Sequence, residues 1–135
     1  MSSNATLAMS ALATKLAAVA TVRQNRAALE TTSATLPIIT LVSQSDTRAG
    51  EQDYDKWLYT RRAVIEYKIA ATSIYQTSLD DALKAIRAAL VPDTGGIWLS
   101  GYAQDLRDTG ATFYHPADNG SDCALQVNIE FDYLE

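Results

Sequence analysis

Few side chains of this chain are of the types that carry out catalysis. It has one histidine, His115, and one cysteine, Cys123. Serine-type catalysis needs a nucleophile, a histidine base and an acid that orients the base, but no nucleophile-elbow sequence accompanies His115. Cys123 begins a stretch of alternating apolar residues, where a cysteine is typically a small core residue. We therefore expect no catalytic residue and predict that the protein is not an enzyme.

The acidic residues suggest no metal or acid–base site. Asp80 and Asp81 are adjacent in a helical pattern, where carboxylates favour the helix start. Asp46, Asp53 and Asp55 lack the alternating oxygen donors, central glycine and final glutamate of a calcium loop. We expect neither a metal nor a cofactor.

Polar, charged and aromatic residues are concentrated between positions 43 and 58. A loop of that length in a compact domain is usually functional or disordered, so we predict an interaction segment here. Two arginines follow it, and in a strand adjacent side chains point to opposite faces, so they cannot act as one clamp. The predicted interface residues are Asp46, Arg48, Asp53, Tyr54, Asp55, Trp57, Arg61 and Arg62.

Two helices are expected to carry the apolar faces that cover a sheet. The first is predicted over residues 4–29, with Ser3 or Asn4 as its cap and Arg23 and Arg26 in its last turns. The second is predicted over residues 78–91, with Ser78 as its cap and the paired aspartates in its first turn. Apolar residues recur along one stripe of each helix.

Four strands are predicted, over residues 36–42, 59–72, within 104–114 and over 123–133. Pro37 should mark the start of the first strand or a sheet edge. The last strand has the clearest period-two alternation in the chain, with large apolar residues at odd positions from Leu125 to Tyr133. Asn119-Gly120 is a strong hairpin signal before it. The predicted fold is α+β, with an antiparallel or mixed sheet of about four strands packed on two helices, in the order α-β-β-α-β-β.

The composition is that of an ordinary globular protein with more acidic than basic residues. Its 135 residues predict a single domain, with 47% hydrophobic and 20% charged residues. The net charge of −5 argues against a protein that grips nucleic-acid phosphates. A lone cysteine allows no internal disulfide, and no secretory signal or membrane-spanning run is evident, so we expect a reducing compartment and no membrane partner.

Several stretches resemble the tail terminator family of long-tailed bacteriophages, the minor tail protein U group. They are Leu36-Pro37-Ile38-Ile39 after an N-terminal helix, Arg61-Arg62 before an alternating strand, the helical run from Leu79 to Leu83, and the closing strand from Val127 to Leu134. The resemblance covers roughly residues 5–135 and rests on pattern and order.

The resemblance implies a structural virion protein. Members close into a hexameric ring on the tail tube, end its polymerisation and present a surface to the neck or head connector. The implied partners are further copies of the chain, the tail tube protein, a neck or head-completion protein and the tape-measure protein, with DNA only passing through the lumen. Assembly would occur in the host bacterial cytoplasm, and the final location would be the tail–neck junction of the virion. Glu130 and Asp132 then become candidates for a subunit contact or an acidic lumen.

Two alternatives remain open. One is a head–tail joining protein of the neck, a class that resembles tail terminators in size and general architecture. The other is a small ligand-binding or enzymatic α+β domain with a pocket near Tyr102, Asp105 and His115.

Overall fold

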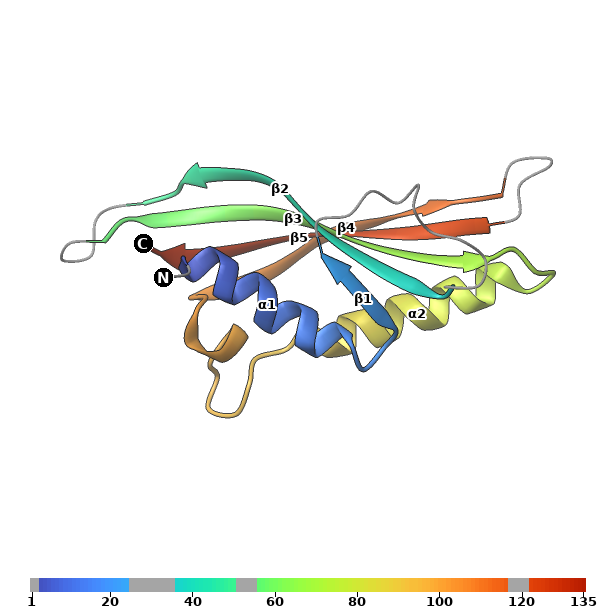
Figure 1. Ribbon diagram of the computed structural model, residues 1–135, viewed down its shortest axis with the longest axis horizontal. Coiled ribbons are helices and arrows are strands. Elements are labelled where there is room, and N and C mark those ends of the chain that lie inside the picture. The colour runs from blue at the N-terminus through green and yellow to red at the C-terminus, as the bar shows by residue number, and fades with distance from the viewer. Residues whose placement is uncertain (1–2, 25–35, 51–55, 117–121) are drawn as a thin grey trace.

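A computed structural model describes residues 3–24, 36–50, 56–116 and 122–135 of the chain (Figure 1). It contains one five-stranded sheet and two α-helices, so the α+β prediction is confirmed, with five strands where about four were expected. The elements are α1 (Asn4–Leu16), β1 (Thr21–Gln24), β2 (Ile38–Arg48), β3 (Leu58–Ala70), α2 (Tyr75–Ala89), the 3₁₀ turn η3 (Leu99–Gly101), β4 (Asp105–Tyr114) and β5 (Asp122–Leu134).

The sheet is built around its two longest strands. Its order is β1-β2-β3-β5-β4, in which β1 pairs with β2 in parallel and every other pair is antiparallel. β3 and β5 pair along their whole length, from Leu58 opposite Leu134 to Ala70 opposite Asp122. Backbone hydrogen bonds of 3.0 and 3.1 Å between Trp57 and Glu135 continue this ladder by one more pair. The C-terminal strand is therefore central in the sheet.

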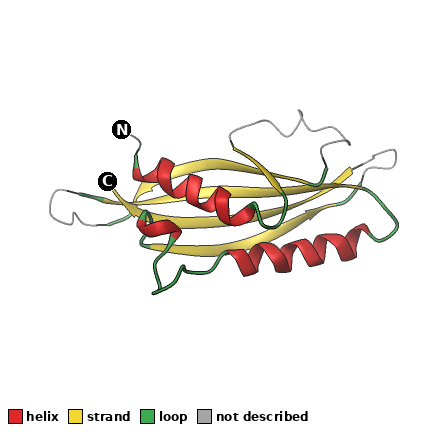
Figure 2. Cartoon of the chain, turned by 60° about the horizontal axis from the view of Figure 1, so that its bottom comes forward, coloured by secondary structure: helices red, strands yellow, loops and turns green. Residues whose placement is uncertain are grey.

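Both helices lie on the same face of the sheet (Figure 2). The odd residues of β5 point toward them and are buried, as the alternation predicted, and Phe131 is among the largest fully buried side chains. Ala63, Ile65 and Ile69 of β3 add to this layer, which confirms the predicted apolar face of that strand. The helices contribute the buried residues Ala5, Ala8, Met9, Leu12, Leu16, Leu79, Ala82 and Ile86.

The first helix is much shorter than predicted. Its start is as expected, because the Ser3 hydroxyl accepts a hydrogen bond from the Thr6 amide. It ends at Leu16, however, and the chain turns into β1, which pairs with Ile38–Leu41 of β2. Arg23 thus lies in a strand rather than in a last helical turn, and Arg26 is outside the described residues. The alanine-rich sequence favours helix locally, but pairing with a distant strand overrides that preference.

Two further boundaries differ from the prediction. β2 begins directly after Pro37, as expected, but it continues to Arg48 through residues assigned to a long loop. β3 is long enough to offer a ladder partner to all of them except Gln44, which lies in a bulge, and Arg61 for example lies opposite Asp46. The second helix begins one turn early, at Tyr75, so Ser78 is not its cap and the paired aspartates lie beyond its first turn. Tyr75 packs against the core, which extends the helix at that end.

Candidate interaction surface on the open face of the sheet

The face of the sheet away from the helices is polar over its central strands. The even residues of β3 and β5 point to this side, and those of β5 are mostly half-buried and polar. The ladder places Glu130 opposite Arg62, and Asp132 opposite Thr60. On the other side of β5, Arg107 lies opposite Glu130, and Asp105 lies opposite Asp132. Three adjacent strands, β3, β5 and β4, therefore bring three carboxylates and two guanidinium groups together.

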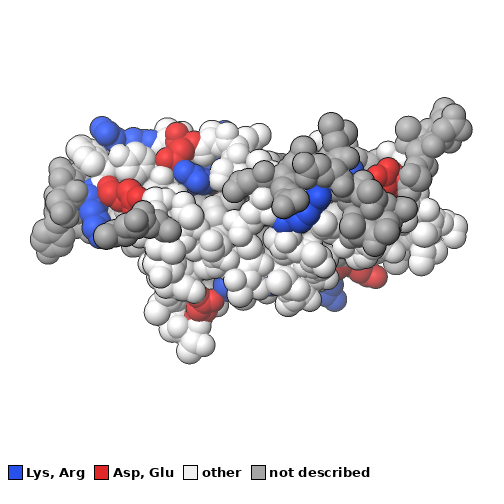
Figure 3. Space-filling model, in the orientation of Figure 1, with Lys and Arg blue, Asp and Glu red and all other residues white. Residues whose placement is uncertain are grey.

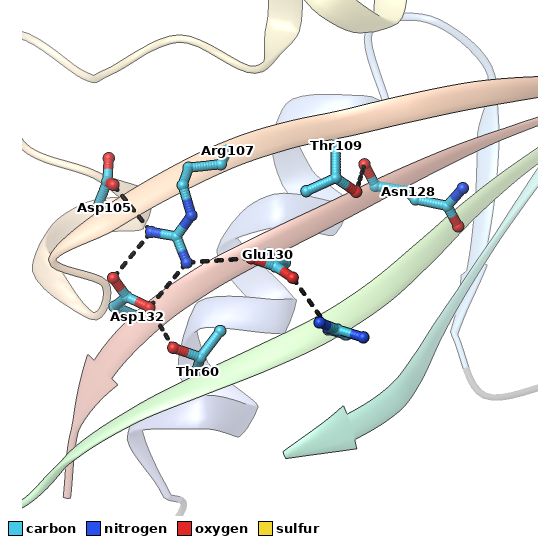
Figure 4. Close-up of polar contacts among 8 residues, drawn as sticks. Thr60, Asp105, Arg107, Thr109, Asn128, Glu130 and Asp132 are labelled. Carbon is cyan, nitrogen blue, oxygen red and sulfur yellow. Dashed lines mark hydrogen bonds and ion pairs between the residues drawn. The ribbon is translucent and has the colours of Figure 1, made fainter. Parts of the chain in front are cut away.

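Arg107 is the centre of this group (Figure 4). Its Nη1 and Nη2 donate to the two carboxylate oxygens of Asp132 at 2.8 and 3.0 Å. Nη1 also donates to Asp105 at 2.9 Å, and Nη2 reaches Glu130 at 3.4 Å. The Nε of Arg62 donates to the other Glu130 oxygen at 2.9 Å. A forked arginine–carboxylate contact of this kind is stronger than a single ion pair and fixes both groups.

Asp132 is the most tightly held of the carboxylates. The Arg107 guanidinium holds the pKa of Asp132 below its usual range, and a 2.6 Å hydrogen bond from the Thr60 hydroxyl acts in the same direction, although burial opposes both. Hydrogen bonds to Asp132 first, and then to Asp105 and Glu130, raise the pKa of Arg107 above its usual value, although burial opposes them. Both groups are therefore ionised at neutral pH, and their charges cancel locally.

Three cations of this face are paired with carboxylates of the same chain. Arg62 pairs with Glu130, Arg107 pairs with three carboxylates, and Lys68 lies 3.7 Å from Asp122. On the side drawn in Figure 3, acidic and basic side chains are interspersed. Glu130 and Asp132 are thus members of an ion-pair network, which with three carboxylates and two guanidinium groups keeps one net negative charge.

A shallow depression of about 280 Å³ lies on this face beside the network. It is lined by Gln44, Arg62, Thr109, Asn128, Ile129 and Glu130. Gln44 and Thr109 stand at irregularities in the pairing of β2 and β4, at the level of Ala63 and Ile129 in the central strands. Bulges increase the local twist of a sheet, so the depression forms where two bulges flank the central pair.

A second cluster brings together predicted interface residues on the helix-covered side. Asp46 accepts hydrogen bonds from the Arg61 Nε at 3.1 Å and from the Tyr133 hydroxyl at 2.7 Å. Burial, followed by the hydrogen bond to Asp46, raises the pKa of Tyr133 to about 12. Arg48 lies over the Trp57 ring at 4.4 Å. Four of the eight predicted interface residues therefore lie at one end of the sheet, where they form two contacting pairs, Asp46 with Arg61 and Arg48 with Trp57.

The remaining predicted site residues are dispersed. Asp53, Tyr54 and Asp55 lie outside the described residues. Arg62 points to the open face, away from Arg61, as strand geometry requires. The structure does not bring together the residues of the pocket considered as an alternative. Asp105 begins ten-residue β4 and His115 follows its last residue, so the two lie about 30 Å apart. His115 instead shares a 2.9 Å hydrogen bond with Tyr75.

Arg107 was not among the predicted site residues, although it makes the most contacts of any charged group on this face. Its partners are separated from it by up to 25 positions in the chain. The strand predicted within residues 104–114 is confirmed, and a hairpin with β5 would have placed Arg107 near Glu130. What the sequence did not supply was the register of that hairpin.

Comparison with known proteins identified no relative that assigns a role to this surface. No family model matches the chain, and no curated protein matches it. Within the described residues, no helix is long and apolar enough to cross a membrane. In the same part of the chain, no three His, Cys, Asp or Glu side chains gather in a way that could hold a metal ion. Cys123 is buried, and this burial raises the pKa of its thiol.

Proposed function

We propose that this protein is a tail terminator of a long-tailed bacteriophage, which caps the tail tube as a hexameric ring and provides the docking surface for the neck. The proposal starts from the resemblance of residues 5–135 to that family. The α+β architecture, with helices on one side of a long-stranded sheet, is compatible with it.

The observation that carries the proposal is the pairing of basic side chains with carboxylates on the open face of the sheet. A channel that DNA must cross should not hold phosphates, and free lysine and arginine groups are what phosphates bind. On this face Arg62, Lys68 and Arg107 are each engaged by carboxylates of the same chain. The face is therefore suited to line a lumen through which DNA slides, with the helices on the outside of the ring.

Electron microscopy of the purified protein, alone and mixed with growing tail tubes, tests the proposal. The expected result is rings with sixfold symmetry that bind one end of the tubes and stop their elongation. Protein that binds filled heads and ignores tubes would instead identify a neck protein. Tubes that elongate normally in the presence of excess protein would refute the proposal.

Charge reversal on the open face tests the role of the lumen separately. Replacing Glu130 and Asp132 by lysine would leave Arg62 and Arg107 without their partners and add two cations. We expect capped tails of this variant to retain or retard DNA. The matched control carries the same two changes at exposed Asp80 and Asp81 on α2 and should release DNA normally. Thermal unfolding of both variants checks that each is folded.

A further inference from the structure

One edge of the sheet is the strand β4. It pairs with β5, and among the described residues nothing pairs with its outer side. The stretches outside the described residues are attached elsewhere, since 25–35 and 51–55 join elements on the β1, β2 and β3 side of the sheet and 117–121 connect the paired ends of β4 and β5. An edge strand presents unpaired backbone amides and carbonyls that can pair with another chain.

Only one part of this edge lacks the usual protection. The first half of β4 carries the charges of Arg107 and Asp108 and ends in the irregularity before Gly110, whose amide donates to the Asp108 carboxylate at 2.9 Å. Charges and bulges are devices that block edge pairing. Residues 111–114 are Ala-Thr-Phe-Tyr, with no charge, proline or bulge, and such residues favour strands. Pro116, which has no amide hydrogen, limits the stretch at its other end.

The side chains of this stretch are ordered so that it can match itself. The ladder with β5 places Gly110, Thr112 and Tyr114 on the open face, and Ala111 and Phe113 on the helix-covered face. When two copies of the stretch run antiparallel with Thr112 opposite Thr112, each aromatic residue lies opposite a small one. Tyr114 faces Gly110 of the other copy, and Phe113 faces Ala111. Directly opposite side chains of this kind stabilise a strand pair.

The open face has room for the incoming ring. Among the described residues, no atom beyond the chain neighbours of Gly110 lies within 4 Å of the position that its Cβ would take. Tyr114 is 47% exposed, and its hydroxyl donates to Gln126 at 3.2 Å, which holds the ring over the open face. An aromatic ring laid across an edge glycine of a neighbouring strand stabilises the pairing. The Tyr114 ring of each copy can therefore cover the backbone that Gly110 leaves bare in the other.

We propose that β4 pairs antiparallel with β4 of a second copy over residues 110–114, with Thr112 at the twofold axis. Both copies then keep their helices on the same side, because residues directly opposite each other in a ladder lie on the same face. The contact joins the same surface of two copies and is complete with two. It is separate from the head-to-tail contacts that a hexameric ring requires, so it goes beyond the proposed function.

Substitutions at Thr112 test the pairing and its register together. Thr112→Lys and Thr112→Glu each place two like charges opposite each other at the axis, which destabilises a strand pair. In sedimentation equilibrium the unmodified chain should form dimers, and each variant alone should be monomeric at the same concentration. An equimolar mixture of the two variants should form one-to-one dimers, because opposite charges then face each other. The matched control is Thr47→Lys, an exposed position of β2 on the same face, which should dimerise like the unmodified chain.

Tyr114→Ala tests the ring that crosses Gly110. Each dimer contains two such pairs, so their loss should raise the dissociation constant by about 2- to 30-fold. Tyr102→Ala is the matched control, because that ring is also exposed but lies outside the strand, and its dissociation constant should not change. Equal dissociation constants for Tyr114→Ala and the unmodified chain would refute the register.

Hydrogen exchange followed by mass spectrometry locates the contact. Dimerisation should slow exchange of the amides of residues 111–114 that point away from β5 by at least about tenfold, because paired amides exchange only when the pairing opens. Exchange in residues 92–96 should not change, and thermal unfolding checks that every variant is folded.

Three results would overturn the proposal. They are a chain that stays monomeric up to millimolar concentration, dimers in which residues 111–114 exchange at the monomer rate, and a mixture of Thr112→Lys and Thr112→Glu that stays monomeric. None of these measurements involves tail tubes, so the pairing and the proposed function can fail independently.

Discussion

Replacing Arg107 by methionine removes the centre of the open-face network and keeps much of the side-chain volume. Asp132 then loses a forked contact, and Asp105 and Glu130 each lose one partner. Hydrogen bonds to charged groups contribute about 1.5–3 kcal/mol when well formed. Because the Arg107 side chain is 38% exposed, solvent screening reduces this value, and we expect a loss of about 1–2 kcal/mol at neutral pH.

The loss should depend on pH in a defined direction. The pKa of Asp132 is lowered in the folded protein, so its contribution is fully present above the unfolded value of about 3.9. It disappears as the pH falls through the lowered folded value, because protonated Asp132 no longer attracts Arg107. The stability difference between the unmodified chain and Arg107→Met should therefore be largest at neutral pH and shrink in acid.

Urea denaturation followed by circular dichroism is the suitable assay, because a guanidinium salt would screen the charges. Arg62→Met is the matched control, since its side chain is 65% exposed and it pairs with one carboxylate, for which about 0–1 kcal/mol is expected. Arg107→Lys retains the charge without the fork and should recover part of the loss. A loss that equals the Arg62→Met value, or that stays constant down to low pH, would refute the reasoning.

Three further predictions concern other parts of the fold. Tyr133→Phe should remove the tyrosine that ionises near pH 12, which ultraviolet titration would show as loss of the most alkaline step. Because the raised pKa makes stability fall as pH rises from about 10 toward 12, the variant should be less sensitive to alkali. An unchanged last step would contradict the raised pKa of Tyr133. Phe131→Ala in the buried layer should cost about 3–5 kcal/mol in urea denaturation, and a loss below about 1 kcal/mol would place the ring outside the core. Ser3→Ala removes the cap on the Thr6 amide and should cost about 0.5–2 kcal/mol, whereas replacing Ser10 by alanine should have little effect.

The fold class and the C-terminal strand were predictable because their signals are local. Alternation from Leu125 to Tyr133 specifies which side chains of β5 are buried whatever strand pairs with it. The apolar stripe of α2 predicted its buried face, and Leu79 and Ile86 are indeed buried. Both patterns rest on the period of one element and need no knowledge of its neighbours.

The errors fall where a neighbour decides the conformation. Residues 21–24 become β1 because Ile38–Leu41 offer a parallel partner, although the surrounding alanines favour helix. Residues 43–48 have no apolar alternation, and they form a strand because β3 pairs with each side of the bulge. The tip of the hairpin predicted at Asn119-Gly120 lies outside the described residues, but β4 and β5 do pair antiparallel.

The sequence by itself determined that this chain has an α+β core, a half-buried final strand and a polar alternate face, since each follows from residue period and propensity. It also supplied the family resemblance on which the proposed function depends. Only the tertiary structure decided the register that carries Arg107 to Asp132 and Glu130, and with it the ion-pair network of the open face. It also decided which strands are edges. Register and edge position depend on contacts between distant segments, and a one-residue slip of β4 against β5 would move Arg107 to the other face.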